Sequence, residues 1–182
     1  RLIQHGGLQQ SRKLENMIFL MDLLDERFHL DFMLLLNSPR YARYLQQLKE
    51  LAHKRPRIHF REPVTMPEIA RTINHYDLGV YLMSPSNFNN RMALPNKLFE
   101  FIQARLAVAI WPSPEMARIV RKHDCGVVAD DFTIEAMAGK LNSLSVQEID
   151  HYKRGAHQAA RILSTESNRR ILRGIVANLI GT

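Results

Sequence analysis

The run from Ala93 to Phe101 holds the residues best suited to bind an anion and a sugar. Pro95 suits the first turn of a helix, because its missing N–H would be unpaired there anyway. A helix start offers free N–H groups and the positive end of the helix dipole, and both favour an anion. Side chains lean back toward the start of their helix, so Glu100 in the second turn is within reach of a ligand docked there. A carboxylate can accept hydrogen bonds from two neighbouring sugar hydroxyls.

The same run is also compatible with an ordinary amphipathic helix. Leu98, Phe101 and Ile102 fall on one face, and Lys97 and Glu100 lie beside it. Most glutamates on helices are simply exposed. The residue pattern alone leaves both alternatives open.

A second candidate anion site follows the first predicted strand. The strand Leu2–His5 leads into Gly6 and Gly7, and glycines after a strand let the backbone approach a ligand closely. Ser11 is a candidate N-cap for a helix that extends to about Glu26. Strand, glycine turn and helix are typical of a phosphate-binding turn, but a plain structural turn fits the pattern at least as well.

The composition is that of one globular domain. The 182 residues are 46% hydrophobic and 24% charged, which suffices for a single core. No apolar run approaches the length of a membrane span, and no signal peptide is visible. Cys125 is the single cysteine, so an internal disulfide is excluded and a reducing, cytoplasmic compartment fits. We interpret this thiol as incidental. The eight histidines show no ligand spacing within one element, so no metal site is expected.

The formal net charge is +7, and much of the excess lies near the C-terminus. From His151 onward a single acid, Glu166, stands against Lys153, Arg154, Arg161, Arg169, Arg170 and Arg173. Such an excess is compatible with nucleic acid, an anionic lipid surface or a phosphorylated ligand. No basic run is interleaved with aromatic residues, so no nucleic acid is expected. A peripheral contact with an anionic membrane surface and a merely solvated helix face both remain open.

Apolar runs alternate with helical patterns along most of the chain. The predicted strands are residues 2–5, 31–36, 57–60, 77–82, 107–110 and 126–129. The predicted helices between them include residues 41–53, a helix that starts near Met66, residues 94–104, residues 112–122, and a helix capped by Thr133. This alternation predicts an α/β fold, a Rossmann-like doubly wound parallel sheet of about six strands with helices on both faces.

Two further segments complete the predicted organisation. Residues 84–90 are polar and contain a proline, so they predict a loop that closes over a ligand. From Val146 the pattern is helical to the end, with Gly181 as a plausible stop.

The run Asn89–Ile102, then Ala104 and the strand Ala107–Ile110, resembles a known segment. It is similar to the donor site of GT-B retaining glycosyltransferases of the glycogen-synthase and bacterial mannosyltransferase type (glycosyl transferases group 1). That family carries a Pro-Asn-Lys-hydrophobic-hydrophobic-Glu-aromatic run, a small-residue turn and a strand. The resemblance covers nearly the whole chain. It implies that residues 1–182 are a single nucleotide-sugar-binding domain, the C-terminal half of such an enzyme.

The resemblance also implies a function and partners. The chain would be the donor-binding domain of a glycosyltransferase that moves a sugar from a nucleoside-diphosphate sugar to an acceptor in glycan biosynthesis, without a metal or other cofactor. The helices of residues 146–182 would cross back to an N-terminal acceptor domain of the same full-length protein. The domain by itself would be inactive. Two alternatives stay open: a non-catalytic Rossmann-type nucleotide-binding or interaction domain, and a nucleotide-sugar epimerase domain.

In an open α/β sheet, ligands bind beyond the carboxyl ends of the strands, where the strand order reverses. The residues expected to bind the nucleotide sugar at that edge are Gly6, Gly7, Arg12, Lys13, Val64, Asn90, Ala93, Leu94, Pro95, Lys97 and Glu100. Glu100 is expected to hold the ribose. The resemblance implies that the loop around Val64 meets the base, largely through backbone groups. Arg12 is expected to stabilise the leaving diphosphate.

The sequence departs from the family pattern at two places. Gly7 stands where the family has an arginine, whereas Arg12 keeps a cation in the place of the family's lysine. Lys13 is the residue expected to compensate. Met92 stands where better-known members have a second acid, so the sugar is expected to meet backbone N–H groups around Ala93 and the side chains of the preceding asparagines.

Overall fold

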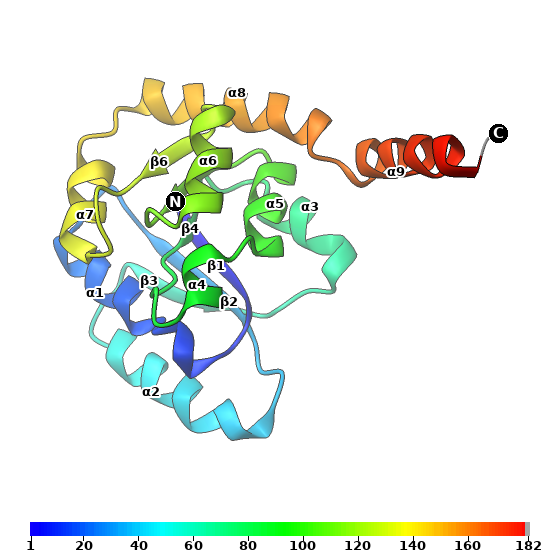
Figure 1. Ribbon diagram of the computed structural model, residues 1–182. Coiled ribbons are helices and arrows are strands. Elements are labelled where there is room, and N and C mark those ends of the chain that lie inside the picture. The colour runs from blue at the N-terminus through cyan, green and yellow to red at the C-terminus, as the bar shows by residue number, and fades with distance from the viewer. Residues whose placement is uncertain (181–182) are drawn as a thin grey trace.

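The computed structural model describes residues 1–180, and these contain one six-stranded sheet (Figure 1). Its strands are β1 Leu2–Gly7, β2 Leu30–Leu35, β3 Ile58–Arg61, β4 Leu78–Tyr81, β5 Ala107–Ile110 and β6 Gly126–Val128. They pair in parallel in the order β3-β2-β1-β4-β5-β6, and Leu2 lies beside Leu30 on one side and beside Leu78 on the other. The strand order therefore reverses between β1 and β4. The predicted α/β fold with a doubly wound parallel sheet is confirmed.

Helices cover both faces of this sheet (Figure 1). One face carries α1 Glu15–Leu23, α2 Ala42–Ala52 and α7 Ile134–Asn142. The other carries α3 Ile69–Ile73, α5 Asn96–Gln103, α6 Pro114–Lys122 and α8 Val146–Ile162. The remaining helical segments are the turns η1 Gln10–Arg12, η2 Pro39–Tyr41 and η3 Met66–Glu68, and the helices α4 Phe88–Met92 and α9 Thr165–Ile180.

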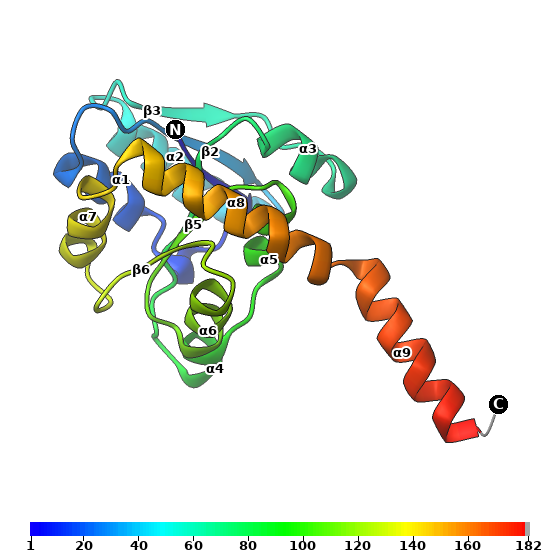
Figure 2. The ribbon, with the colours of Figure 1, turned by 90° about the horizontal axis from the view of Figure 1, so that it is seen from above.

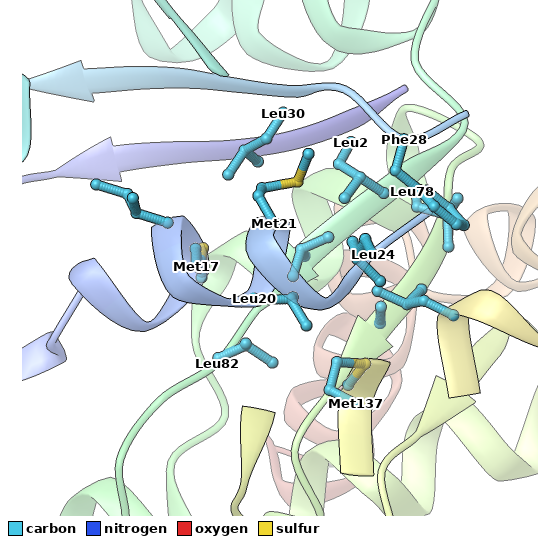
Figure 3. Packing of buried hydrophobic residues seen from close by; sticks show 14 of the residues in the cluster. Leu2, Met17, Leu20, Met21, Leu24, Phe28, Leu30, Leu78, Leu82 and Met137 are labelled. Atoms are coloured by element: carbon cyan, nitrogen blue, oxygen red, sulfur yellow. The ribbon is translucent and has the colours of Figure 1, made fainter. Parts of the chain in front are cut away.

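Each face of the sheet has its own apolar core. In the first core, Met17, Leu20 and Met21 of α1 are buried; Met21 lies toward Leu2 and Leu30 of the sheet, and Leu20 lies toward Leu82 and Met137 (Figure 3). These α1 residues recur at helical spacing, so a single stripe of the helix is buried. Burial on both faces explains why the strands are nearly continuous apolar runs.

The second core fixes α5, the helix that begins in the Ala93–Phe101 run. Phe101 is fully buried, and its ring lies directly on Gly79 of β4. A Cβ atom at Gly79 would lie 2.2 Å from the Phe101 ring, far inside van der Waals contact. The glycine therefore lets α5 sit close to the sheet, and this close packing sets the position of Lys97 and Glu100 on the same helix.

The predicted start of α1 was wrong. Ser11 does not cap the helix but lies within η1, and α1 begins at Glu15. The cause is Lys13, which adopts the left-handed conformation (φ 48°) and so separates the turn from the helix. The hydroxyl of Tyr44 accepts the Leu14 N–H instead. The helix ends at Leu23, before the predicted end near Glu26.

Other predicted element boundaries differ less from the observed ones. β1 continues through both glycines, where the sequence predicted a turn. The segment predicted as a loop over residues 84–90 includes the start of α4, which the side chain of Asn87 caps. The helical run from Val146 is broken near Ser164, between α8 and α9. The cap at Thr133 is confirmed, since its side chain accepts the Ala136 N–H. Gly181, the expected stop, lies outside the described residues.

The C-terminal helix α9 projects from the body of the molecule (Figure 2). Its apolar side chains are exposed: Ile171, Leu172, Ile175, Val176, Leu179 and Ile180. α8, by contrast, buries Ala156, Ala159 and Ala160 against the second core. None of the described helices is both long enough and apolar enough to cross a membrane.

Candidate functional site

A cleft of about 470 Å³ opens at the carboxyl ends of the strands, where the strand order reverses. Ligands in open α/β sheets bind at this point. Its walls come from the end of β1, the turn η1, the end of β2, the loop from β3 to α3, and the start of α5. Of the residues expected from the sequence, it is lined by Gly6, Gly7, Arg12, Val64, Leu94, Pro95, Lys97 and Glu100.

Gly6 and Lys97 form the floor of the cleft together. Gly6 has a φ of 108°, a conformation that side-chain-bearing residues rarely adopt. A Cβ atom at Gly6 would also lie 2.6 Å from the Lys97 Nζ atom. The backbone therefore requires the glycine, and a side chain at this position would displace the Lys97 amine.

The amine of Lys97 is a buried cation that lies over Gly6. The residue is 7% exposed, and its Nζ atom lies 5.4 Å from the centre of the Tyr81 ring. Burial, followed by the charge of Arg12, lowers the Lys97 pKa to about 8, while Glu100 acts in the opposite direction. None of the hydrogen bonds or ion pairs found among residues 1–180 involves this amine. A cation in such a setting is well suited to meet an anion from the cleft.

Arg12 reaches the same floor from η1. Its Nη1 atom donates a hydrogen bond of 2.9 Å to the Gly7 carbonyl. That bond braces the end of β1, and the Arg12 side chain lines the cleft with Lys97. The site therefore presents two cations.

The start of α5 adds a third feature that favours an anion. Pro95 stands immediately before the first helical residue, Asn96, rather than within the first turn. In the described part of the chain, no side-chain oxygen caps this helix end. The first amides of α5 and the positive end of its dipole are thus available at the cleft.

Glu100 stands one turn further along α5, with its side chain 22% exposed. Burial raises the pKa of its carboxyl group, and the charge of Lys97 lowers it in part. The Oε2 atom lies 3.5 Å from Nε2 of His5. This is within ion-pair distance, but burial and then Lys97 lower the His5 pKa to about 4. At neutral pH the imidazole in this contact is therefore neutral.

Three of the residues expected from the sequence do not line the cleft. Lys13 is exposed on the left-handed link after η1. The backbone N–H of Asn90 bonds to the Asn87 side chain, and its own amide donates to Ser86, so it is engaged in the cap of α4. Ala93 links α4 to α5. Lys13 therefore lies outside the cleft, and Lys97 lies over Gly6 inside it.

Other lining residues were not expected. His5 is the main one, and its place at the end of a predicted strand was the available signal. Met33, Leu35, Pro63 and Ile69 form an apolar wall near the ends of β2 and β3. Over residues 1–180, no three or more His, Cys, Asp or Glu side chains group closely enough to hold a metal ion.

Cys125 has no part in this cleft. It is fully buried just before β6, and burial, with the charge of Asp124, raises its pKa to about 12. A thiol with such a pKa is a poor nucleophile.

Comparison with known proteins by sequence found nothing: no family model matches the chain, and no curated protein matches it. Solved structures do match. One is the C-terminal domain of a glycosyl transferase group 1 family protein (LpcC) from Francisella tularensis, with a TM-score of 0.69 and 13% identity over 89% of this chain and 85% of that one. Another is Anabaena Alr3699/HepE in complex with UDP and glucose, with a TM-score of 0.72 and 14% identity over 97% of this chain and 48% of that one.

A third match is WaaG, a glycosyltransferase involved in lipopolysaccharide biosynthesis, with a TM-score of 0.60 and 19% identity over 91% of this chain and 43% of that one. The chain thus spans less than half the length of HepE and WaaG, and most of the C-terminal domain of LpcC. It has the fold of the C-terminal domain of GT-B glycosyltransferases, as the resemblance of its sequence predicted.

Proposed function

We propose that this chain is the donor-binding domain of a glycosyltransferase and that its cleft binds a nucleoside-diphosphate sugar. One observation carries the proposal: two cations, an uncapped helix start and a half-buried carboxylate converge on the glycines at the end of β1, at the reversal of the strand order. The fold is shared with HepE, which was solved with UDP and glucose and with UDP-glucose.

The diphosphate is assigned to the floor of the cleft. Gly6 brings its backbone close to the ligand, while Lys97 and Arg12 supply positive charge from two sides. The first amides of α5 complete the cradle. Lys97 thereby supplies the positive charge that the family pattern places on an arginine directly after Gly6.

The nucleoside is assigned to the two sides of that floor. The Glu100 carboxylate accepts hydrogen bonds from the adjacent hydroxyls of the ribose. The base lies against the apolar wall of Val64 and its neighbours, at the loop between β3 and α3. The sugar then projects toward the segment around Ala93 and Leu94.

In the transfer step, the bond between the anomeric carbon of the sugar and the diphosphate oxygen breaks, an acceptor hydroxyl oxygen forms the new bond to that carbon, and the hydroxyl proton passes to the leaving diphosphate or to solvent. Negative charge develops on that oxygen as the sugar leaves for the acceptor. Lys97, Arg12 and the α5 dipole are fixed before the reaction, so they stabilise this charge without reorganising. The nucleoside diphosphate is the released product.

The acceptor is assigned to an N-terminal domain of the full-length protein. The chain covers less than half of HepE and WaaG, which leaves room for such a domain. The exposed apolar stripe of α9 is the surface that this domain would cover. Arg169, Arg170 and Arg173 beside the stripe suit a cytoplasmic protein in peripheral contact with an anionic membrane.

The first prediction concerns this chain without a second domain. We expect it to bind nucleoside diphosphates with dissociation constants of about a millimolar, and to transfer no sugar. Half of a cleft excludes water poorly, so the charges act at reduced strength and the acceptor is missing. Isothermal titration with UDP, GDP and ADP measures the binding, and release of nucleotide from UDP-glucose or GDP-mannose measures the chemistry. Absence of binding to every nucleotide at millimolar concentration would contradict the proposal, as would robust transfer.

A further inference from the structure

His5 is a buried histidine that lines the cleft. It lies near the end of β1 and is only 1% exposed. Neither ring nitrogen has a hydrogen-bond partner among residues 1–180. Buried polar nitrogens are nearly always paired, so an unpaired imidazole that lines a cleft points to a partner made only when the site is occupied.

The ring of His5 is held in one orientation by its packing. It meets the Phe101 ring edge-on, with ring centres 5.1 Å apart and an interplanar angle of 87°. Phe101 is in turn fixed against Gly79. In this packing the Nε2 atom of His5 lies 3.5 Å from the Glu100 carboxylate.

The protonation state of His5 fits a donor rather than a counter-ion. A neutral imidazole has one N–H donor and one acceptor nitrogen. With the N–H on Nε2, the ring can donate to one Glu100 oxygen. The remaining acceptor sites of the carboxylate are then left for the ligand. Lys97, Arg12 and Glu100 are the charged groups that line the cleft together with His5. The Lys97 amine lies over Gly6.

We propose that His5 is a positioning residue of the nucleotide site: it holds the Glu100 carboxylate in the orientation that accepts both adjacent hydroxyls of a ribose. The inference rests on the proposed function, since it assumes that a ribonucleotide occupies the cleft. His5 itself touches no reacting atom. Its role is to make the site select a ribose over a deoxyribose.

The test compares UDP with 2′-deoxy-UDP by isothermal titration, and GDP with 2′-deoxy-GDP as a second pair. The wild-type chain should bind the ribonucleotide about tenfold more tightly, because one charge-assisted hydrogen bond is lost with the 2′-hydroxyl. His5→Phe preserves the packing on Phe101 but removes both nitrogens. It should reduce the preference to less than about twofold, because UDP loses more affinity than 2′-deoxy-UDP does.

Two amide variants sharpen the test. The Gln side chain places a donor near the position of Nε2, whereas Asn places one near Nδ1. His5→Gln should therefore retain the ribose preference, and His5→Asn should lose it. Thermal melting of each variant shows whether it is folded.

The possible outcomes separate the two proposals. A His5→Phe chain that keeps the full ribose preference, or that loses affinity equally for both nucleotides, overturns the positioning role. A wild-type chain that binds UDP and 2′-deoxy-UDP equally also overturns it, while diphosphate binding stands. A wild-type chain that binds none of the four nucleotides overturns the proposed function itself.

Discussion

Replacement of Lys97 by methionine is expected to weaken nucleoside-diphosphate binding about ten- to hundredfold, the loss of one charge-assisted contact of roughly 1.5–3 kcal/mol. Methionine keeps the length and the apolar stem of the lysine, so the packing over Gly6 and Tyr81 survives. Only the charge over the floor of the cleft is removed. Isothermal titration with UDP and GDP measures the effect.

Lys13 provides the matched control. It is a lysine that follows the turn η1, but it is exposed and does not line the cleft. Lys13→Met should change the affinity by less than about twofold, as expected for a surface charge. The opposite ranking of the two variants would show that the compensating cation is Lys13, as the sequence pattern suggested, and not Lys97.

The pH dependence follows from the lowered pKa of Lys97. In the free chain this pKa is about 8, so the amine is charged at pH 7 and loses its proton above pH 8. A bound diphosphate favours the charged amine and raises the pKa, so affinity should fall as the pH rises past 8. His5, with a pKa near 4, and Tyr81, whose pKa burial raises above 10, keep their charge in this range. Lys97→Arg should abolish the decline, because a guanidinium stays protonated.

Glu100→Gln and Arg12→Ala are expected to give opposite signatures. Glu100→Gln removes the carboxylate charge, so the affinity for the nucleoside and for the nucleotide should both fall by about ten- to hundredfold. Arg12→Ala should weaken UDP or GDP to a similar extent but leave uridine or guanosine almost unchanged, because a nucleoside carries no phosphate. Titration of both variants with the nucleoside and with its diphosphate provides the four affinities to compare.

Uridine or guanosine also serves as the internal control. Arg12 braces the Gly7 carbonyl, so an Arg12→Ala chain in which the end of β1 is disturbed would lose nucleoside affinity as well. If Glu100→Gln binds every nucleotide as the wild type does, then α5 is merely amphipathic and Glu100 is an ordinary helix glutamate.

The architecture was predictable because it depends on local pattern. Continuous apolar runs such as residues 31–36 indicated buried parallel strands, and the observed β2 is displaced from that range by a single residue at each end. The limits of α1 were not predictable. The left-handed conformation of Lys13 is not visible in a pattern of apolar spacing, and the bond from Leu14 to Tyr44 joins distant parts of the chain.

The backbone features of the site could be predicted from the sequence, but several of its side-chain contacts could not. Gly6, Pro95 and Glu100 follow from the rules for strand ends and helix starts, and all three line the cleft. The burial of Lys97 over Gly6 depends on the close approach of α5 to β4, which Gly79 and Phe101 allow. The pairing of His5 with Glu100 has the same origin. Such contacts across elements cannot be derived from spacing along one element.

The most direct test is to map where a nucleoside diphosphate binds. Amide resonances of the ¹⁵N-labelled chain are followed by NMR while UDP or GDP is added to about a millimolar or above, the range expected for half of a cleft. With UDP or GDP, the largest shifts should fall on the amide resonances of Gly6, Gly7, Asn96 and Lys97. Uridine or guanosine should shift the resonances near Glu100 and leave those of the two glycines unchanged. Shifts centred on another surface, or none at these amides when binding is saturated, would contradict a diphosphate site between β1 and α5.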